Sequence, residues 1–274
     1  MNSDPSLTIY PDLLQGSDEW FAQRCGLVTA SVIGDLITTR KLTAIDYDCP
    51  ACGAIPDAPC RSKKGVATIK TLHPERAETA RHTSSIVFHP ANNDTARGLT
   101  TLLVAERITG WVDPTYISDD MLRGIEDEPR ARDIYSEHYE PVHEIGFMVR
   151  EHDGARIGYS PDGLVGGDGL IEIKSRRPKI HVGHVLSGHP PSEVMPQLQC
   201  GLLVSGRQWI DYISFSAGMP MWVHRVYPDE RWFDAILTAV HTFETNAADM
   251  IERYHEAVQG LPTTERITEM EMVI

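Results

Sequence analysis

The spacing of apolar residues divides the chain into helices and short strands that alternate along the sequence. Apolar positions at helical spacing predict helices over about 17–24, 30–37, 95–109, 119–139, 192–205 and 229–258. Apolar alternation and short apolar runs predict strands over about 143–151, 155–160, 170–175, 209–215 and 221–227. Residues 1–12 are expected to be loose, because Pro5 and Pro11 interrupt regular structure. Interleaved helices and strands indicate an α/β protein.

One predicted strand, Ile171-Glu172-Ile173-Lys174, carries charges that packing does not explain. Its two isoleucines point to one face, so the glutamate and the lysine point together to the other. A glycine-rich turn at 166–169 folds the chain back and brings Asp162 near Glu172. Two carboxylates can hold a hard divalent cation, and an adjacent ammonium can act on water or phosphate. The pattern predicts metal-dependent phosphodiester cleavage; the alternative is a surface hairpin with a Glu–Lys pair.

Five separated motifs have the order and approximate spacing of a known family. They resemble the lambda-exonuclease/YqaJ-type phage recombination nucleases over about residues 13–245, apart from one insertion. The motifs are Glu19-Trp20 with Arg24, Gly26 and Thr29-Ala30-Ser31; Gly124 with Glu128; Ser160-Pro161-Asp162-Gly163; Glu172-Ile173-Lys174; and Gln197-Leu198-Gln199. The resemblance implies a PD-(D/E)xK, restriction-endonuclease-like fold: a mixed central sheet flanked by helices, with the metal site at one edge.

The resemblance also assigns roles at the metal site. Asp162, Glu172 and the carbonyl of Ile173 would bind Mg²⁺ or Mn²⁺, with two ions expected. Lys174 would orient or activate the attacking water. Gln197 would position the scissile phosphate or the water; without the resemblance it would be taken for an exposed helix position.

Glu128 matches the helix glutamate that completes the metal site in this family. Its neighbours Glu126 and Asp127 could be confused with it, and Glu128 is preferred for its position relative to Gly124. Taken alone, the segment is polar enough to be a solvated helix face. Pro129 is expected to kink the helix or to start a new one.

Arg24, Ser31 and Ser160 would bind the 5′-phosphate of a DNA end, by the same resemblance. A guanidinium forks onto phosphate oxygens, and a serine at a helix start adds a donor beside the positive end of the helix dipole. The alternative is that Arg24 pairs with a nearby acid and Ser31 only caps a helix.

The function implied is a 5′→3′ exonuclease acting on double-stranded DNA ends. It would release 5′-mononucleotides and leave 3′ overhangs for a single-strand annealing protein, and a ring-shaped homotrimer is the family expectation. Two alternatives stay open. One is a single-strand or structure-specific nuclease of the same fold; the other is an inactive DNA-binding adaptor, against which the joint presence of Asp162, Glu172 and Lys174 argues.

Composition sets the class of protein and its division into parts. The chain has 274 residues, 41% hydrophobic and 23% charged, as in globular proteins. The expected parts are an exonuclease core (1–44 and 83–260), an insertion (45–82) and a tail (261–274). No apolar stretch of membrane length and no secretory signal is recognised, so a cytoplasmic location is expected, in the host if the protein is phage-encoded.

The net charge of −14 argues against a protein that coats DNA. Basic residues are concentrated, however. Residues 49–82 hold six Lys/Arg against three acids, a formal +3, so the rest of the chain carries −17. Arg176, Arg177 and Lys179 form a second cluster. A nuclease needs positive potential only along its DNA channel, and the basic insertion is expected to contribute to duplex binding.

Cysteine spacing indicates a metal rather than disulfides. Cys49, Cys52 and Cys60 lie in one short segment that includes a Cys-x-x-Cys knuckle. A tetrahedral structural zinc needs a fourth ligand, for which His73 is the choice and His82 the reserve. The run resembles small zinc-finger modules of actinobacteriophage proteins. Reduced structural thiols, a redox pair or an iron–sulfur cluster are the alternatives.

Overall fold

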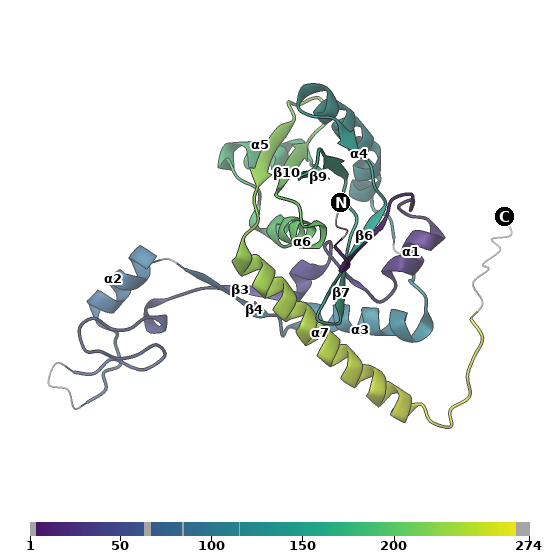
Figure 1. The fold of residues 1–274 in the computed structure, drawn as a ribbon. Coiled ribbons are helices and arrows are strands. Elements are labelled where there is room, and N and C mark those ends of the chain that lie inside the picture. Colours follow the sequence, from purple (N-terminus) through teal and green to yellow (C-terminus); the bar gives the residue numbers. More distant parts are fainter. Residues whose placement is uncertain (1–3, 63–66, 84, 115, 267–274) are drawn as a thin grey trace.

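The computed structural model describes residues 4–62, 67–83, 85–114 and 116–266, which form an α/β fold (Figure 1). The α-helices are α1 (Asp18–Arg24), α2 (Pro74–Thr83), α3 (Asp94–Thr109), α4 (Asp119–His138), α5 (Pro178–Ser187), α6 (Met195–Ser205) and α7 (Glu230–Ala257). The strands are β1 (Leu7–Tyr10), β2 (Val28–Thr29), β3 (Ile37–Lys41), β4 (Ile86–Pro90), β5 (Val142–His143), β6 (Phe147–His152), β7 (Ala155–Tyr159), β8 (Gly163–Val165), β9 (Gly169–Ser175), β10 (Trp209–Phe215) and β11 (Trp222–Val226). Short 3₁₀ turns are η1 (Ile33–Leu36), η2 (Ala44–Asp46) and η3 (Ser192–Val194).

The strands outside the arm form two mixed sheets rather than one. The order β1-β6-β7-β2 gives a four-stranded sheet, and β11-β10-β9-β8-β5 gives a five-stranded sheet. One pair in each sheet is parallel, β2 with β7 and β9 with β10. The chain passes from the first sheet to the second between Tyr159 and Gly163, so residues 160–162 lie at the junction. The predicted α/β architecture is confirmed, but its mixed strands are divided between two sheets instead of forming one central sheet.

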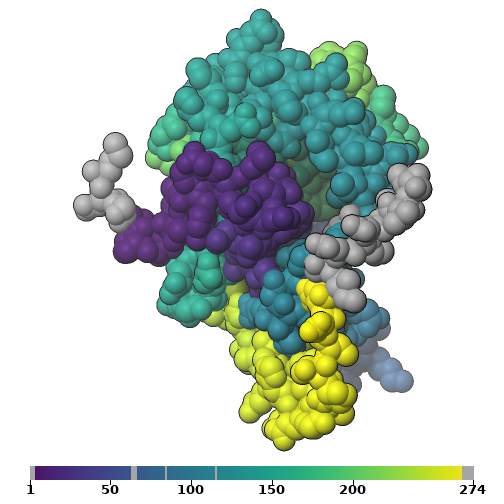
Figure 2. Space-filling view, turned by 90° about the vertical axis from the view of Figure 1, so that its right-hand side faces the viewer, coloured from purple at the N-terminus to yellow at the C-terminus, as the bar shows by residue number. Residues whose placement is uncertain are grey.

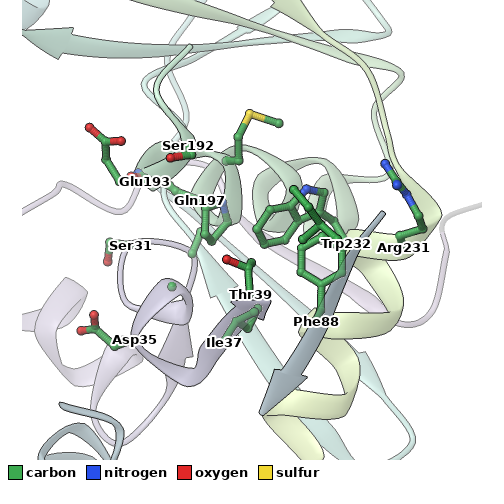
Figure 3. A pocket seen from close by; sticks show the side chains of 15 residues that line it. Ser31, Asp35, Ile37, Thr39, Phe88, Ser192, Glu193, Gln197, Arg231 and Trp232 are labelled. Carbon is green, nitrogen blue, oxygen red and sulfur yellow. The ribbon is translucent and has the colours of Figure 1, made fainter. Parts of the chain in front are cut away.

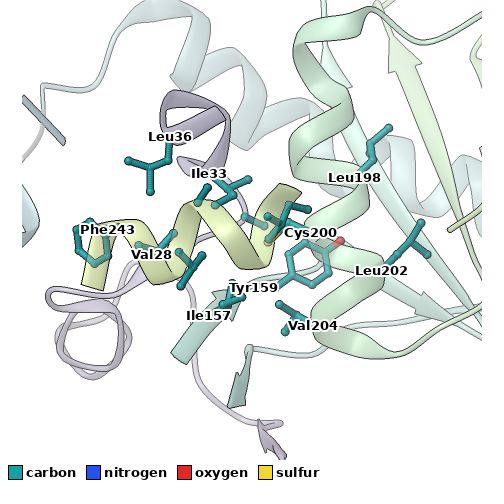
Figure 4. Close-up of a cluster of buried hydrophobic side chains, with 14 of the residues drawn as sticks. Val28, Ile33, Leu36, Ile157, Tyr159, Leu198, Cys200, Leu202, Val204 and Phe243 are labelled. Carbon is teal, nitrogen blue, oxygen red and sulfur yellow. The ribbon is translucent and has the colours of Figure 1, made fainter. Parts of the chain in front are cut away.

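The main apolar core lies between the sheets and helices α3, α6 and α7 (Figure 4). Tyr159 and Leu198 are almost wholly buried there. The ring of Tyr159 lies against Gly201 of α6, where an added Cβ would come within 2.7 Å of the ring. A second cluster packs α4 against β9 and β10 and contains Ile171 and Ile173. The two isoleucines therefore anchor one face of β9, as the alternation predicts.

An arm projects from this core (Figure 1). We use "arm" for the described residues between 37 and 90. Its stem is the antiparallel ribbon β3–β4, in register from Ile37 opposite Pro90 to Lys41 opposite Ile86. Beyond the ribbon lie the predicted cysteine ligands and α2. Most of the arm belongs to the segment 45–82 that the sequence predicts as an insertion; the division into core, insertion and tail stays a prediction.

Several predicted elements were wrong, and the missed strands are ones that pair with segments distant in the sequence. The helix predicted over 30–37 is instead a turn after β2, followed by η1 and the start of β3. The segment expected to be loose contains β1, which pairs with β6. No element was predicted over 86–90, where β4 lies, or over 178–187, where α5 lies. The strand expected over 143–151 is divided into β5 and β6.

The long helices agree closely with their predicted ranges. Ser17 caps α1 by accepting a hydrogen bond from the Trp20 amide at 3.2 Å. Helix α4 continues through Pro129, so the proline neither ends the helix nor starts another. Figure 2 shows the N-terminal segment, in purple, covering the middle of one face above the yellow end of α7. Within the described residues, no helix is both long and apolar enough to cross a membrane.

Candidate active site

The junction between the two sheets brings the predicted carboxylates and lysine together. The Ile173 amide donates to Asp162 Oδ2 at 2.6 Å, which fixes the aspartate beside β9. On the opposite face of β9 from the isoleucines, Lys174 Nζ donates to Glu172 Oε1 at 2.6 Å. The glutamate is almost fully buried, with 1% of its surface exposed. The predicted hairpin geometry is therefore present, and the surface-hairpin alternative is excluded by this burial.

Helix α6 and strand β7 add two further contacts to Glu172. Gln197 Nε2 donates to Glu172 Oε1 at 2.5 Å, so the predicted glutamine faces the carboxylates rather than solvent. The Tyr159 hydroxyl donates to Glu172 Oε2 at 3.3 Å from inside the core. Tyr159 was not predicted. Its position depends on the close approach to Gly201, and no local motif indicates that approach.

Helix α4 contributes Glu128, held by an arginine that was not predicted. Arg132 donates through Nη2 to Glu128 Oε1 at 2.5 Å and through Nε to the Asp162 carbonyl at 2.9 Å. Because glutamate and arginine are four residues apart on a helix, this spacing was a usable sequence signal. Glu126 is exposed and Asp127 accepts from Ser175 at 2.7 Å, so of the three acids Glu128 is the one tied to Asp162.

We call Glu128, Asp162, Glu172, Lys174 and Gln197 the carboxylate centre. Its electrostatics favour a bound cation. Burial raises the pKa of Asp162 well above its usual value, and the charges of Glu172 and Glu128 raise it further. Burial also raises the pKa of Glu128, against the opposing charge of Arg132. Burial alone would lower the pKa of Lys174, but the charges of Glu172 and Asp162 outweigh it and the pKa is raised. Three carboxylates thus face two cationic side chains.

A divalent metal fits this donor set. Asp162 and Glu172 offer hard oxygen ligands, and Glu128 and the Ile173 carbonyl are the other predicted ligands. Added positive charge would offset both the excess of carboxylates and the desolvation that raises the pKa of Asp162. Glu172 now points to Lys174 and Gln197, so binding a shared ion requires the carboxylate side chains to rotate.

A second constellation lies beside the centre and contains the predicted end-binding residues. The guanidinium of Arg24 lies 4.1 Å from the Trp20 ring and donates to Thr29 and Ser31 hydroxyls, each at 3.3 Å. Trp20 Nε1 donates to Ser160 Oγ at 3.0 Å. We call Trp20, Arg24, Ser31 and Ser160 the end pocket. It adjoins the carboxylate centre because Ser160 is two residues before Asp162 in the chain.

Arg24 has no carboxylate within 4 Å among the described residues, against the alternative that it pairs with a local acid. The nearby Glu106 instead accepts from the Gly26 amide at 2.7 Å. Burial lowers the pKa of Arg24 to about 10, with the Glu106 charge opposing, so the guanidinium stays charged at neutral pH. A half-buried cation beside hydroxyl donors is suited to an oxyanion such as phosphate.

The four predicted zinc ligands also lie together, in the arm. The ligand atoms of Cys49, Cys52, Cys60 and His73 all lie within 4.8 Å of one another, and Cys49 Sγ is 3.4 Å from His73 Nδ1. A knuckle forms where the Cys49 carbonyl accepts from the amides at positions 52 and 53. Hydrogen bonds, the Arg61 amide first, lower the pKa of Cys52 to about 6. His82, the reserve ligand, is exposed and contacts Glu78 instead.

Arg76 of α2 holds the backbone around the cysteine cluster with hydrogen bonds. Its side chain is fully buried and donates to four backbone carbonyls of the arm at 2.7–2.9 Å. It also approaches Cys60 Sγ at 3.6 Å. Arg76 is one of the six Lys/Arg residues of segment 49–82, but its burial makes it unavailable to DNA. A further group of possible ligands, His152, Asp153 and His241, lies at the surface of the core.

The match to a family model decides the relationship. The model of the YqaJ-like viral recombinase domain matches residues 19–208. The chain belongs to this family. The matched range contains the carboxylate centre, the end pocket and the cysteine cluster, and the resemblance inferred from the five motifs is confirmed.

Solved structures extend the comparison. This YqaJ-like chain is similar to an alkaline exonuclease, LHK-Exo, from Laribacter hongkongensis, with 26% identity and a TM-score of 0.64 over 90% of this chain and 100% of that one. LHK-Exo in complex with dAMP gives the same values. A phage related exonuclease from Haemophilus somnus 129PT matches at 15% identity and a TM-score of 0.45, over 59% of this chain and 85% of that one. No curated protein matches the chain.

Proposed function

We propose that the protein is a metal-dependent DNA exonuclease that degrades the 5′-ended strand of duplex DNA and leaves a 3′ overhang. One observation carries the proposal: the end pocket and the carboxylate centre are joined by Ser160-Pro161-Asp162, and Trp20 holds Ser160 in place at 3.0 Å. A phosphate site next to a cleavage site is what exonucleolytic attack from an end requires. The family membership and the likeness to LHK-Exo support it.

Each residue of the centre has a proposed role. Asp162, Glu172, Glu128 and the Ile173 carbonyl would hold Mg²⁺ or Mn²⁺, which when bound supplies Lewis-acid stabilisation of the phosphoryl oxygens. Lys174 orients the attacking water. Its amine, which donates to Glu172, can hold a proton beside the carboxylate. Gln197 positions the scissile phosphate. Arg132 fixes Glu128 relative to the Asp162 backbone, so it acts as a positioning residue.

The end pocket would set polarity. Arg24 would contact the terminal 5′-phosphate with its guanidinium, while the Ser31 and Ser160 hydroxyls donate to the remaining oxygens. The product would be a 5′-mononucleotide. LHK-Exo forms a complex with dAMP, which belongs to this class of molecule. The overhang would be passed to a single-strand annealing protein, and a homotrimer would enclose the duplex.

The cysteine cluster would hold one structural zinc. Three thiols and one imidazole form a complete tetrahedral ligand set. The arm's apolar cluster is small, since it consists of the three cysteines with Ala54, Ile69 and Leu72. A metal bond would therefore supply the stability that this cluster lacks.

The decisive experiment compares duplexes whose ends are 5′-phosphorylated or 5′-hydroxyl. The wild type should digest phosphorylated ends faster by about tenfold or more, because the charged Arg24 contact is lost with the phosphate. Arg24→Ala should abolish the preference while retaining slow digestion. Arg253→Ala is the matched control, since that arginine lies exposed near the end of α7 and pairs with Asp249 of the same helix.

Two outcomes would overturn the proposal. Equal wild-type rates on both ends would remove the phosphate clamp and with it the basis for 5′→3′ polarity. Efficient cleavage of covalently closed circular DNA would show an endonuclease, which is the alternative of a structure-specific enzyme with the same fold.

A further inference from the structure

A groove opens next to the candidate active site, between the arm and helices α6 and α7 (Figure 3). Its volume is about 660 Å³, within the range of sites that hold a small organic ligand. Ser31 of the end pocket and Gln197 of the carboxylate centre both line it. The groove is therefore continuous with both parts of the site, yet none of the roles proposed above uses it.

The far wall of the groove is aromatic. Phe88 of β4 and Trp232 of α7 are half-buried, and their ring centroids are 4.4 Å apart with an angle of 53° between the planes. Figure 3 shows the two rings grouped together on the side of the groove away from Ser31. Exposed aromatic faces beside a DNA site are suited to stacking on bases, which tolerates any sequence.

Apart from Ser31 and Gln197, which are proposed above to contact phosphates, the lining of the groove favours a base over another phosphate. Asp35 and Glu193 both line it and both carry negative charge, which repels a phosphodiester. Arg231, the basic residue of the lining, is already paired with Asp229 at 2.6 Å. The remaining lining is largely apolar, including Ile37, Ile86, Met195 and Pro196. A neutral, flat and partly apolar group fits these surroundings.

From this arrangement we infer that the groove binds unpaired nucleobases of the DNA strand whose end enters the site, with Phe88 and Trp232 as the stacking platform. The inference rests on the proposed function, since it takes the terminal phosphate to lie at Ser31 and the scissile phosphate at Gln197. A base attached between those phosphates projects to one side of the backbone. The groove that both residues line is the space open to it.

The platform also links the arm to catalysis. Phe88 lies on the ribbon that carries the cysteine cluster, whereas Trp232 lies on the core helix α7. A base stacked on this pair contacts both parts of the molecule. The arm would therefore help to hold the unpaired end as well as any duplex beside it.

The test measures binding without cleavage. Full-length, zinc-loaded protein is mixed with a 5′-phosphorylated single strand carrying 2-aminopurine near its 5′ end, with Ca²⁺ in place of Mg²⁺. A second strand has the same phosphates but abasic sugars at its first three positions. The wild type should change the 2-aminopurine fluorescence and bind the base-bearing strand about tenfold more tightly, the scale of one or two stacked bases.

The variants separate stacking from folding. Trp232→Leu and Phe88→Leu keep apolar bulk but remove the aromatic face, so each should erase most of the preference for base-bearing DNA and leave abasic binding unchanged. Tyr254→Ala removes an exposed aromatic residue of the same helix α7, outside the groove, and should change neither affinity. Circular dichroism of each variant should match the wild type.

Equal wild-type affinity for the two strands, or failure of both to bind, would overturn the inference, and so would a variant that weakens both strands equally. Failure of the proposed function shows differently. If the protein binds base-bearing strands through the groove but digests no DNA with Mg²⁺, the base-binding inference stands and the exonuclease proposal is refuted.

Discussion

The carboxylate centre draws its residues from three helices or strands and the sheet junction, whereas the cysteine cluster takes all four of its residues from positions 49–73. The centre lies beside two apolar clusters that are built from aliphatic and aromatic side chains and not from its carboxylates. In the arm, the three cysteines make up half of the apolar cluster, beside Ala54, Ile69 and Leu72. Metal at the first site would therefore serve chemistry, and metal at the second would serve folding.

The polar contacts of the two sites show the same difference. At the centre, carboxylates are gathered in excess and burial raises the pKa of Asp162, so the arrangement is costly to the fold. In the arm, Arg76 donates to four carbonyls and stabilises the backbone around the thiols. A functional site held by a strong core can tolerate strain, whereas a small module needs each of its contacts.

The largest expected effect is the loss of cleavage without loss of stability. Asp162→Asn should lower the rate by about a thousandfold or more, because it removes a charged metal ligand. The raised pKa means that ionised Asp162 disfavours the native state at neutral pH, so the melting temperature should stay the same or rise. Asp168→Asn, in the exposed turn of the same hairpin, is the control. Near-normal digestion by Asp162→Asn would refute the centre.

The pH dependence of activity sharpens the same side of the comparison. The pKa of Asp162 is raised, so its carboxylate is protonated at a higher pH than usual, and a proton competes there with the metal. At subsaturating Mg²⁺ the rate should fall by about tenfold per pH unit below that pKa. Higher Mg²⁺ should move the fall to lower pH. Initial rates measured at two Mg²⁺ concentrations test this, and a profile that does not move would contradict it.

The smallest effect on catalysis is expected from the arm. Cys49→Ser should reduce bound zinc from about one per chain to none and unfold the arm locally, while short duplexes are still digested. Elemental analysis and hydrogen exchange of the arm measure both parts. His82→Ala should keep its zinc, because that side chain lies outside the cluster. Zinc that survives Cys49→Ser but leaves with His241→Ala would belong to the surface group in the core.

The carboxylate centre could be predicted because charges on an apolar strand are conspicuous in sequence. The alternation of Glu172 and Lys174 with isoleucines is local, and so is the glycine turn that brings Asp162 close. Tyr159 has no such signal, since its hydroxyl reaches Glu172 only because the core is packed around Gly201. Arg132 had a signal in its helical spacing, and its role was missed.

The long helices were predictable for the same reason, since their periodicity is local. Strand β1 was missed because it is stabilised by β6, about 140 residues away in sequence. The ribbon β3–β4 likewise closes across the whole insertion. Arg76 shows the limit of charge counting: it is one of the six basic residues in the +3 segment, and it is wholly buried. Sequence gives the charge of a side chain but not the direction in which it points.

The short connection Ser160-Pro161-Asp162 has a consequence for the size of the product. Two residues of extended chain span at most about 7 Å, so a phosphate bound at Ser160 and a bond broken at Asp162 cannot be separated by several nucleotides. Proline stiffens this connection and the Trp20 hydrogen bond anchors one end of it. The bound phosphate and the cleaved bond would then be about one nucleotide apart, so each cut would remove a single nucleotide.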